Sequence, residues 1–205
     1  MRAASDLRPC RTRTLALLAG TIALLVPSAA SGTHYDNMFR TAYKNGNCST
    51  SSFCQTDNAA LTVHRGGSLS DSGKANIAWT LDNSYTTTDL NVSYDSTATY
   101  TGSAETDIIY YVNGGLPSTT LGVTWCDDPL DDGLRCDQHY VAFHYDTPAI
   151  SLACHETGHA VGLTHGDEAF ARQPNDEYDL QCMRQPASSS TQYVGHNAGW
   201  IDVTY

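Results

Sequence analysis

The chain has 205 residues and a formal net charge of −11, because 22 acidic residues stand against 11 Lys and Arg residues. A negative charge of this size argues against nucleic acid and anionic membranes as partners, since both repel it. The length suits one domain with a hydrophobic core of its own.

Residues 1–30 have the composition of a secretory signal peptide. Four Arg residues precede a 12-residue apolar run, Leu15 to Val26, which is too short to span a bilayer as a stable helix. Small residues then offer a cleavage site after Ala30. We therefore expect a secreted, extracellular protein in which residues 31–205 form a single domain. That part carries 7 Lys and Arg against 21 Asp and Glu, a net charge of −14. We also expect it to be a monomer and to have no membrane partner.

The first part of this domain predicts loops, one short strand and one helix. Residues 31–60 are rich in Asn, Ser and Thr and predict a loop-rich segment. Ala60–His64 is a short β-like run. A helix is expected over residues 70–81, with Ser70 or Asp71 as its N-cap, because short polar side chains satisfy the free N–H groups of a first turn.

The middle of the chain predicts β-structure. Alternating polar and apolar residues or short apolar runs indicate strands at Thr88–Tyr94, Asp107–Val112, Leu121–Cys126 and His139–Tyr145. A second helix is expected directly after the last of these strands. Strands with one early helix and one late helix indicate an α+β fold.

Five carboxylates crowd the segment 127–137: Asp127, Asp128, Asp131, Asp132 and Asp137. Carboxylates gathered on a loop can bind Ca²⁺, although their spacing does not match that of an EF-hand. The alternative is a solvated acidic loop without an ion. Both interpretations remain open from the sequence.

The most informative stretch is His155-Glu156-Thr157-Gly158-His159-Ala160-Val161-Gly162-Leu163-Thr164-His165. A helix over Pro148–Val161, capped by Thr147, would place His155 and His159 on one face, one turn apart. Two neutral imidazoles at this separation can hold one Zn²⁺. Gly158 inside the helix costs roughly 1 kcal/mol relative to Ala, which indicates that another segment passes close to it or that the site requires a small residue.

Gly162 can take a positive φ, end the helix and turn the chain so that His165 supplies a third ligand. Three protein ligands leave one tetrahedral position for water, which is the arrangement of catalytic zinc sites. Glu156, next to the first ligand, is then expected to act as a general base rather than as a ligand.

These eleven residues match the HExxHxxGxxH signature of the metzincin clan of zinc metalloproteases at every defined position. The resemblance implies a twisted, mostly parallel sheet with an antiparallel edge strand, an active-site helix, and a C-terminal subdomain after Gly162. It also implies that Met183 forms a turn beneath the zinc and that Leu121–Cys126 pairs with extended substrate. The implied activity is hydrolysis of internal peptide bonds in protein or peptide substrates, with a zinc-bound water and Glu156 as base.

Two positions separate this chain from particular families of the clan. Gly166 follows the third ligand where those families carry other residues, so the family within the clan stays unassigned. Gln185, two residues after Met183, stands where some families have a zinc-binding Tyr, so no fifth ligand is expected. A zinc-containing binding module without turnover is the alternative function, and the intact Glu156 argues against it.

Six cysteines remain after residue 30, an even number that suits an exported protein. Six cysteines allow 15 pairings, and the spacing favours Cys48–Cys54, Cys126–Cys136 and Cys154–Cys182. The last bridge would tie the helix of His155 to the segment of Met183. Near the C-terminus, residues 188–190 are expected to cap a final helix.

Overall fold

The structure is a computed structural model that describes residues 35–40, 46–102, 104–193 and 195–205. The signal peptide predicted at residues 1–30 lies outside the described residues. The strands are β1 (Gln55–Thr56), β2 (Thr62–Arg65), β3 (Ser93–Asp95), β4 (Ile108–Val112), β5 (Gly122–Pro129) and β6 (Arg135–Phe143). The helices are α1 (Asp71–Thr80), α2 (Ile150–Ala160) and α3 (His196–Thr204), with a π-helical turn η1 (Leu81–Tyr85) and 3₁₀ turns η2 (Gly166–Glu168) and η3 (Tyr178–Met183).

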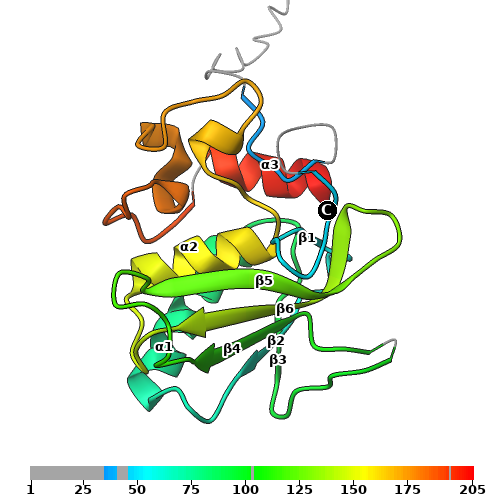
Figure 1. The fold of residues 1–205 in the computed structure, drawn as a ribbon, viewed down its shortest axis with the longest axis vertical. Coiled ribbons are helices and arrows are strands. Elements are labelled where there is room, and N and C mark those ends of the chain that lie inside the picture. Colours follow the sequence, from blue (N-terminus) through cyan, green and yellow to red (C-terminus); the bar gives the residue numbers. More distant parts are fainter. Residues whose placement is uncertain (1–34, 41–45, 103, 194) are drawn as a thin grey trace, which may run out of the picture. The chain divides into compact units, whose positions relative to one another are not determined.

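One mostly parallel sheet organises the molecule (Figure 1). Its strands follow the order β1-β6-β4-β2-β3, and all neighbours on this path run parallel. Strand β5 alone runs antiparallel, beside β6, in a register that pairs Gly122 with Phe143 and Cys126 with His139. The α+β class and the antiparallel strand predicted at Leu121–Cys126 are therefore confirmed.

Helix α2 packs across β5 and β6, and α1 packs beside it. Tyr110 on β4 donates to or accepts from Thr157 on α2, with 2.9 Å between the hydroxyl oxygens. Gly73 of α1 lies against the carbonyl of Asp146, where a Cβ atom would overlap the oxygen. Gly73 thus permits α1 to approach the segment leading into α2.

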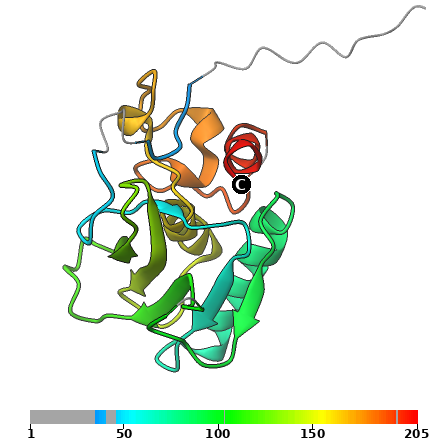
Figure 2. The same cartoon turned by 90° about the vertical axis from the view of Figure 1, so that its right-hand side faces the viewer.

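The chain after α2 forms a further layer that contains η2, η3 and α3. Figure 2 shows α3 beside η3, away from the sheet, and Asn197 of α3 donates to the carbonyl of Leu180 at 2.8 Å. Hydrophobic residues from the sheet, the helices and this layer form one buried cluster around α2. The helix that carries the candidate site is consequently enclosed by the rest of the domain.

Several predicted boundaries are wrong. Ser70 caps α1 as expected and accepts from the N–H of Gly73, but Ala149 rather than Thr147 precedes α2 and makes no side-chain cap. The strand predicted at Thr88–Tyr94 is reduced to β3. Gly195, not residues 188–190, precedes the last helix. The hydroxyl of Thr147 instead bonds to that of Ser70, with 2.7 Å between the oxygens.

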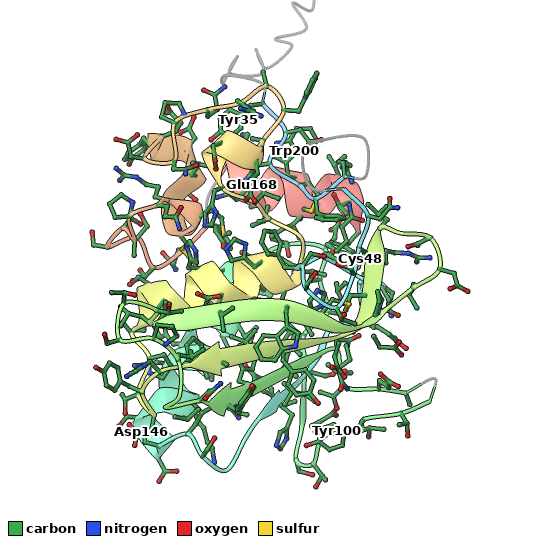
Figure 3. All side chains as sticks on the ribbon, in the orientation of Figure 1. Tyr35, Cys48, Tyr100, Asp146, Glu168 and Trp200 are labelled. Atoms are coloured by element: carbon green, nitrogen blue, oxygen red, sulfur yellow. A yellow bond between two sulfur atoms is a disulfide. The ribbon has the colours of Figure 1, made fainter. Side chains whose placement is uncertain are left out.

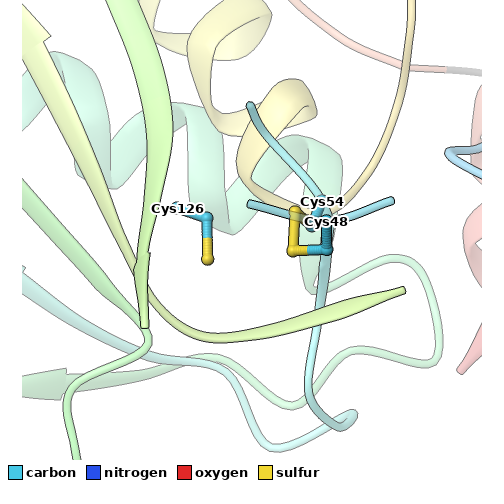
Figure 4. A group of neighbouring side chains, drawn as sticks. All are labelled: Cys48, Cys54 and Cys126. Atoms are coloured by element: carbon cyan, nitrogen blue, oxygen red, sulfur yellow. A yellow bond between two sulfur atoms is a disulfide. The ribbon is translucent and has the colours of Figure 1, made fainter. Parts of the chain in front are cut away.

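All three predicted disulfides are present: Cys48–Cys54, Cys126–Cys136 and Cys154–Cys182. The first two bridges lie beside each other, as Figure 4 shows for Cys48, Cys54 and Cys126, and they pack with Phe39 in a second buried cluster. Disulfides of this kind fit an oxidising compartment. No helix among the described residues is long and apolar enough to cross a membrane.

Candidate metal centre

Helix α2 presents three of the predicted site residues, His155, Glu156 and His159, and all three are buried. Gly162 has a φ of +91°, which only glycine adopts without strain, and the chain turns there. The N–H of Leu163 donates back to the carbonyl of Gly158 at 2.8 Å. This turn, predicted from Gly162, returns the chain so that His165 faces the helix.

The three histidine rings converge on one point. The Nε2 atoms of His159 and His165 each lie 3.2 Å from Nε2 of His155. Two nitrogens bound to one zinc at about 2.05 Å with tetrahedral angles stand about 3.3 Å apart. The spacing of the three Nε2 atoms therefore fits a metal ion between them.

The outer nitrogen of each ring faces an acceptor. Nδ1 of His155 lies 2.6 Å from the carbonyl of Cys182, and Nδ1 of His159 lies 2.9 Å from that of Leu163. Nδ1 of His165 lies 3.4 Å from a carboxylate oxygen of Glu168. Because Nδ1 carries the proton in such contacts, all three Nε2 atoms present lone pairs. Three lone pairs that face one another repel unless a cation lies between them.

Burial favours the neutral form of two of these histidines, His155 and His159. It lowers the pKa of His155 to about 4 and holds that of His159 well below its ordinary value. Neutral imidazole is the form that binds metals. Three imidazole nitrogens suit zinc and also copper, iron and nickel, so the donor set by itself does not select one metal.

Glu156 is 5% exposed and its carboxylate is held by strand β5. The hydroxyl of Thr124 lies 2.8 Å from Oε2 of Glu156 and 2.9 Å from its backbone carbonyl. Burial raises the pKa of Glu156 to about 7, while the Thr124 hydroxyl and His165 act in the opposite direction. Gly122 makes room for this side chain, since a Cβ there would lie 2.7 Å from Oε1 and 2.8 Å from Cγ of Glu156.

Met183 packs against helix α2 at Gly158. Its sulfur lies 3.0 Å from the hydroxyl oxygen of Tyr193, and both side chains pack on Gly158. A Cβ on Gly158 would overlap both of them. The close approach predicted from this glycine is confirmed, and the approaching groups are the side chains of Met183 and Tyr193.

The Cys154–Cys182 bridge joins the helix of His155 to the segment of Met183. Cys182 supplies the carbonyl that faces Nδ1 of His155, and the hydroxyls of Tyr85 and Tyr193 both donate to the carbonyl of Cys154 at 2.9 Å. The carbonyl of Cys182 therefore helps to orient the ring of His155, and the carbonyl of Cys154 holds two buried tyrosine hydroxyls.

The acidic residues of segment 127–137 do not converge as one set. Asp132 faces Arg135, with 2.6 Å between Oδ2 and Nε, and it accepts from the N–H of Leu134. Asp128 and Asp137 instead lie with Glu105, their carboxylate oxygens within 4.8 Å of one another. Exposed acidic groups gather in this way without an ion as well, so the calcium alternative stays untested.

Several residues at this site escaped the sequence analysis. Thr124, Gly122 and Tyr193 lie far from the histidines in sequence, and no spacing points to them. Glu168 stands three residues after His165, accepts from its N–H at 3.2 Å, and is labelled in Figure 3 beyond α2. That short spacing was a usable signal for a residue that orients the third histidine.

No protein-family model and no curated protein matches this chain.

Proposed function

We propose that this chain is a secreted zinc-dependent endopeptidase of the metzincin kind, which hydrolyses internal peptide bonds of proteins. The observation that carries the proposal is the convergence of three Nε2 lone pairs, on His155, His159 and His165, where the helix also holds the buried carboxylate of Glu156. Structural zinc sites use four protein ligands, whereas three ligands beside a carboxylate suit catalysis.

A bound zinc ion supplies Lewis acidity, which lowers the pKa of a water molecule and polarises the carbonyl of a peptide bond. Glu156 accepts the proton from that water as it attacks the carbonyl carbon. It then gives the proton to the amine that leaves. A carboxyl group whose pKa is raised by burial to about 7 is suited to both steps near neutral pH.

Thr124 and Gly122 support this role of Glu156. The hydroxyl of Thr124 restrains the carboxylate, and the missing side chain of Gly122 leaves the space that it occupies. Both belong to β5, the antiparallel strand. An extended peptide that adds to such a strand is held by main-chain hydrogen bonds, which favours polypeptide substrates of varied sequence.

Secretion is part of the proposal. It is supported by the composition of residues 1–30 and by the three disulfides, which persist in oxidising surroundings. The net charge of −14 after residue 30 also suits a protein that stays in solution outside the cell.

The test uses the mature chain, residues 31–205, loaded with zinc. We expect about one zinc per chain by elemental analysis and cleavage of casein that a chelator abolishes and added zinc restores. Glu156→Ala should retain the zinc and lose activity by about 100- to 10,000-fold, the range for loss of a general base. His165→Ala should lose zinc as well as activity.

Two results would count against the proposal. Cleavage by Glu156→Ala at the original rate would exclude its role as base. Zinc binding by the original chain without cleavage of any member of a broad peptide library would favour the zinc-containing binding module instead.

A further inference from the structure

The outer edge of β5 has backbone groups that can pair with a peptide. Among the described residues only β6 pairs with this strand, and the carbonyl of Leu121 accepts from His144 on that inner side. Backbone groups of alternate residues in an antiparallel strand point to opposite sides. Gly122 and Thr124 therefore direct their N–H and C=O groups outward from the edge, while their side-chain positions face Glu156.

The next outward position, Cys126, is already occupied. Its N–H donates to the carbonyl of Ser52 at 2.7 Å, so the loop between Cys48 and Cys54 takes the place of a neighbouring strand there. The interval from Thr124 to Cys126 is two residues, about 7 Å of extended chain. A peptide that pairs with β5 meets this loop after that distance.

The same loop also contacts the candidate metal ligands. The ring of Phe53, next to Ser52, lies 4.1 Å from that of His159 between centroids and is tilted by 32°. Ser52 thus occupies the outer edge of β5, and its neighbour Phe53 covers the candidate metal ligand His159. Together they form a wall at one end of the free edge.

The loop is fixed at several points. The Cys48–Cys54 bridge closes it (Figure 4), and within it the N–H of Ser52 donates to the carbonyl of Ser49 at 3.0 Å. The N–H of Cys48 donates to the carbonyl of Gly133 at 2.7 Å, between β5 and β6. The N–H of Cys54 donates to Nε2 of His139 at 3.3 Å. These bonds oppose displacement of the loop by a peptide.

From this geometry we infer that the Cys48–Cys54 loop ends the substrate edge and determines substrate specificity. This inference rests on the proposed function. On the side of the metal toward Cys126, about two substrate residues pair with β5. The second of them contacts Phe53, and residues beyond it make no backbone pairing. On the other side of the metal, no backbone bond among the described residues sets such a limit.

The test uses peptides whose position is fixed by a hydroxamate group, which chelates zinc. One series carries the hydroxamate at the C-terminus and extends by one alanine at a time from the metal toward its N-terminus. The other carries it at the N-terminus and extends in the opposite direction. Their affinities for zinc-loaded Glu156→Gln protein are measured by calorimetry, with acetohydroxamate as the reference, so that the readout does not require cleavage.

We expect one of the two peptide series to gain roughly five-fold in affinity with each paired residue and to stop gaining after about the second residue. The other series should continue to gain affinity as it is lengthened. Continued gain through the fourth residue in both series would overturn the inference, and so would a series in which no residue adds affinity to acetohydroxamate. If affinity follows the expected pattern but the active chain cleaves nothing, the proposed function fails and the inference about the edge stands.

Two variants examine the loop itself. Cys48→Ser/Cys54→Ser releases the loop, and we expect the third and fourth residues of the limited series to add affinity in it. Phe53→Ala should improve the binding of peptides with a bulky second residue relative to alanine by at least five-fold. The matched control is Tyr100→Ala, an exposed aromatic residue labelled in Figure 3 away from α2, which should leave that preference unchanged. An unchanged preference in Phe53→Ala would contradict the assignment of Phe53.

Discussion

The hydroxyl of Thr124 lies 2.8 Å from the carboxylate of Glu156, and this contact joins the antiparallel strand to the helix that carries the histidines. Thr124 is 7% exposed, so water competes little for the bond. The candidate general base is therefore positioned by a residue 32 positions earlier in the chain.

Replacement of Thr124 by Val keeps the shape of the side chain and removes its hydroxyl. A hydrogen bond to a charged group contributes about 1.5–3 kcal/mol, so we expect kcat/KM for a peptide substrate to fall about 10- to 100-fold. Zinc content should remain at one per chain, because Thr124 is not among the ligands.

Thr124→Ser is the matched control for this variant. It keeps the hydroxyl, and we expect it to retain most of the activity. Equal losses in the Val and Ser variants would show that packing of the methyl group, rather than the hydrogen bond, determines the effect.

Gly122→Ala is expected to abolish most activity without removing the metal. The added Cβ would lie 2.7–2.9 Å from three atoms of the Glu156 side chain, which must move away. Activity and zinc content measured on the same sample separate this effect from loss of the site.

A suitable control is Gly199→Ala in α3, where nothing lies within 4 Å of the added atom. It should leave activity unchanged and increase helix stability slightly, since alanine favours helix over glycine. If Gly122→Ala remained fully active, the position of the Glu156 carboxylate described above would not be the one used in catalysis.

Removal of the Cys154–Cys182 bridge by a double Ser replacement should lower the free energy of unfolding by about 3.5 kcal/mol, from the entropy of a loop closed over 28 residues. Zinc affinity should fall too, because the carbonyl of Cys182 orients His155. Urea unfolding with and without zinc measures both effects.

The comparison is the double Ser replacement of Cys48 and Cys54. That bridge spans only 6 residues and should contribute about 2 kcal/mol in the same treatment, with no loss of zinc affinity. A larger loss of stability from the shorter loop would contradict this entropic account.

His139 should make the protein less stable in acid. It is fully buried, its Nε2 accepts from the N–H of Cys54, and burial lowers its pKa to about 3 from an ordinary value of 6.5. The folded state thus binds the proton more weakly than the unfolded state does. Its stabilising contribution is complete above pH 6.5 and is lost as the pH falls toward 3.

His139→Gln retains an acceptor that does not titrate, so the free energy of unfolding should decline less between pH 6.5 and 4 than in the original chain. Both proteins are measured with the metal chelated, and since His155 and His159 are the same in both, the difference isolates His139. Parallel stability curves for the two proteins would exclude this role.

The sequence by itself determined the features that depend on local spacing. His155 and His159 share a helix face because four residues make about one turn, and Gly162 turns the chain because glycine tolerates a positive φ. The three disulfides followed from the spacing of six cysteines. The antiparallel strand near Leu121–Cys126 was predicted from the resemblance to metzincins and from its apolar run.

Only the tertiary structure decided the partners of these residues. Thr124 and Gly122 reach Glu156, Tyr193 reaches Met183, and Phe53 reaches His159 because the sheet, the helix and the loops pack together. A one-dimensional pattern records the period of a helix or strand, but it does not record which side chains meet across the space between distant segments.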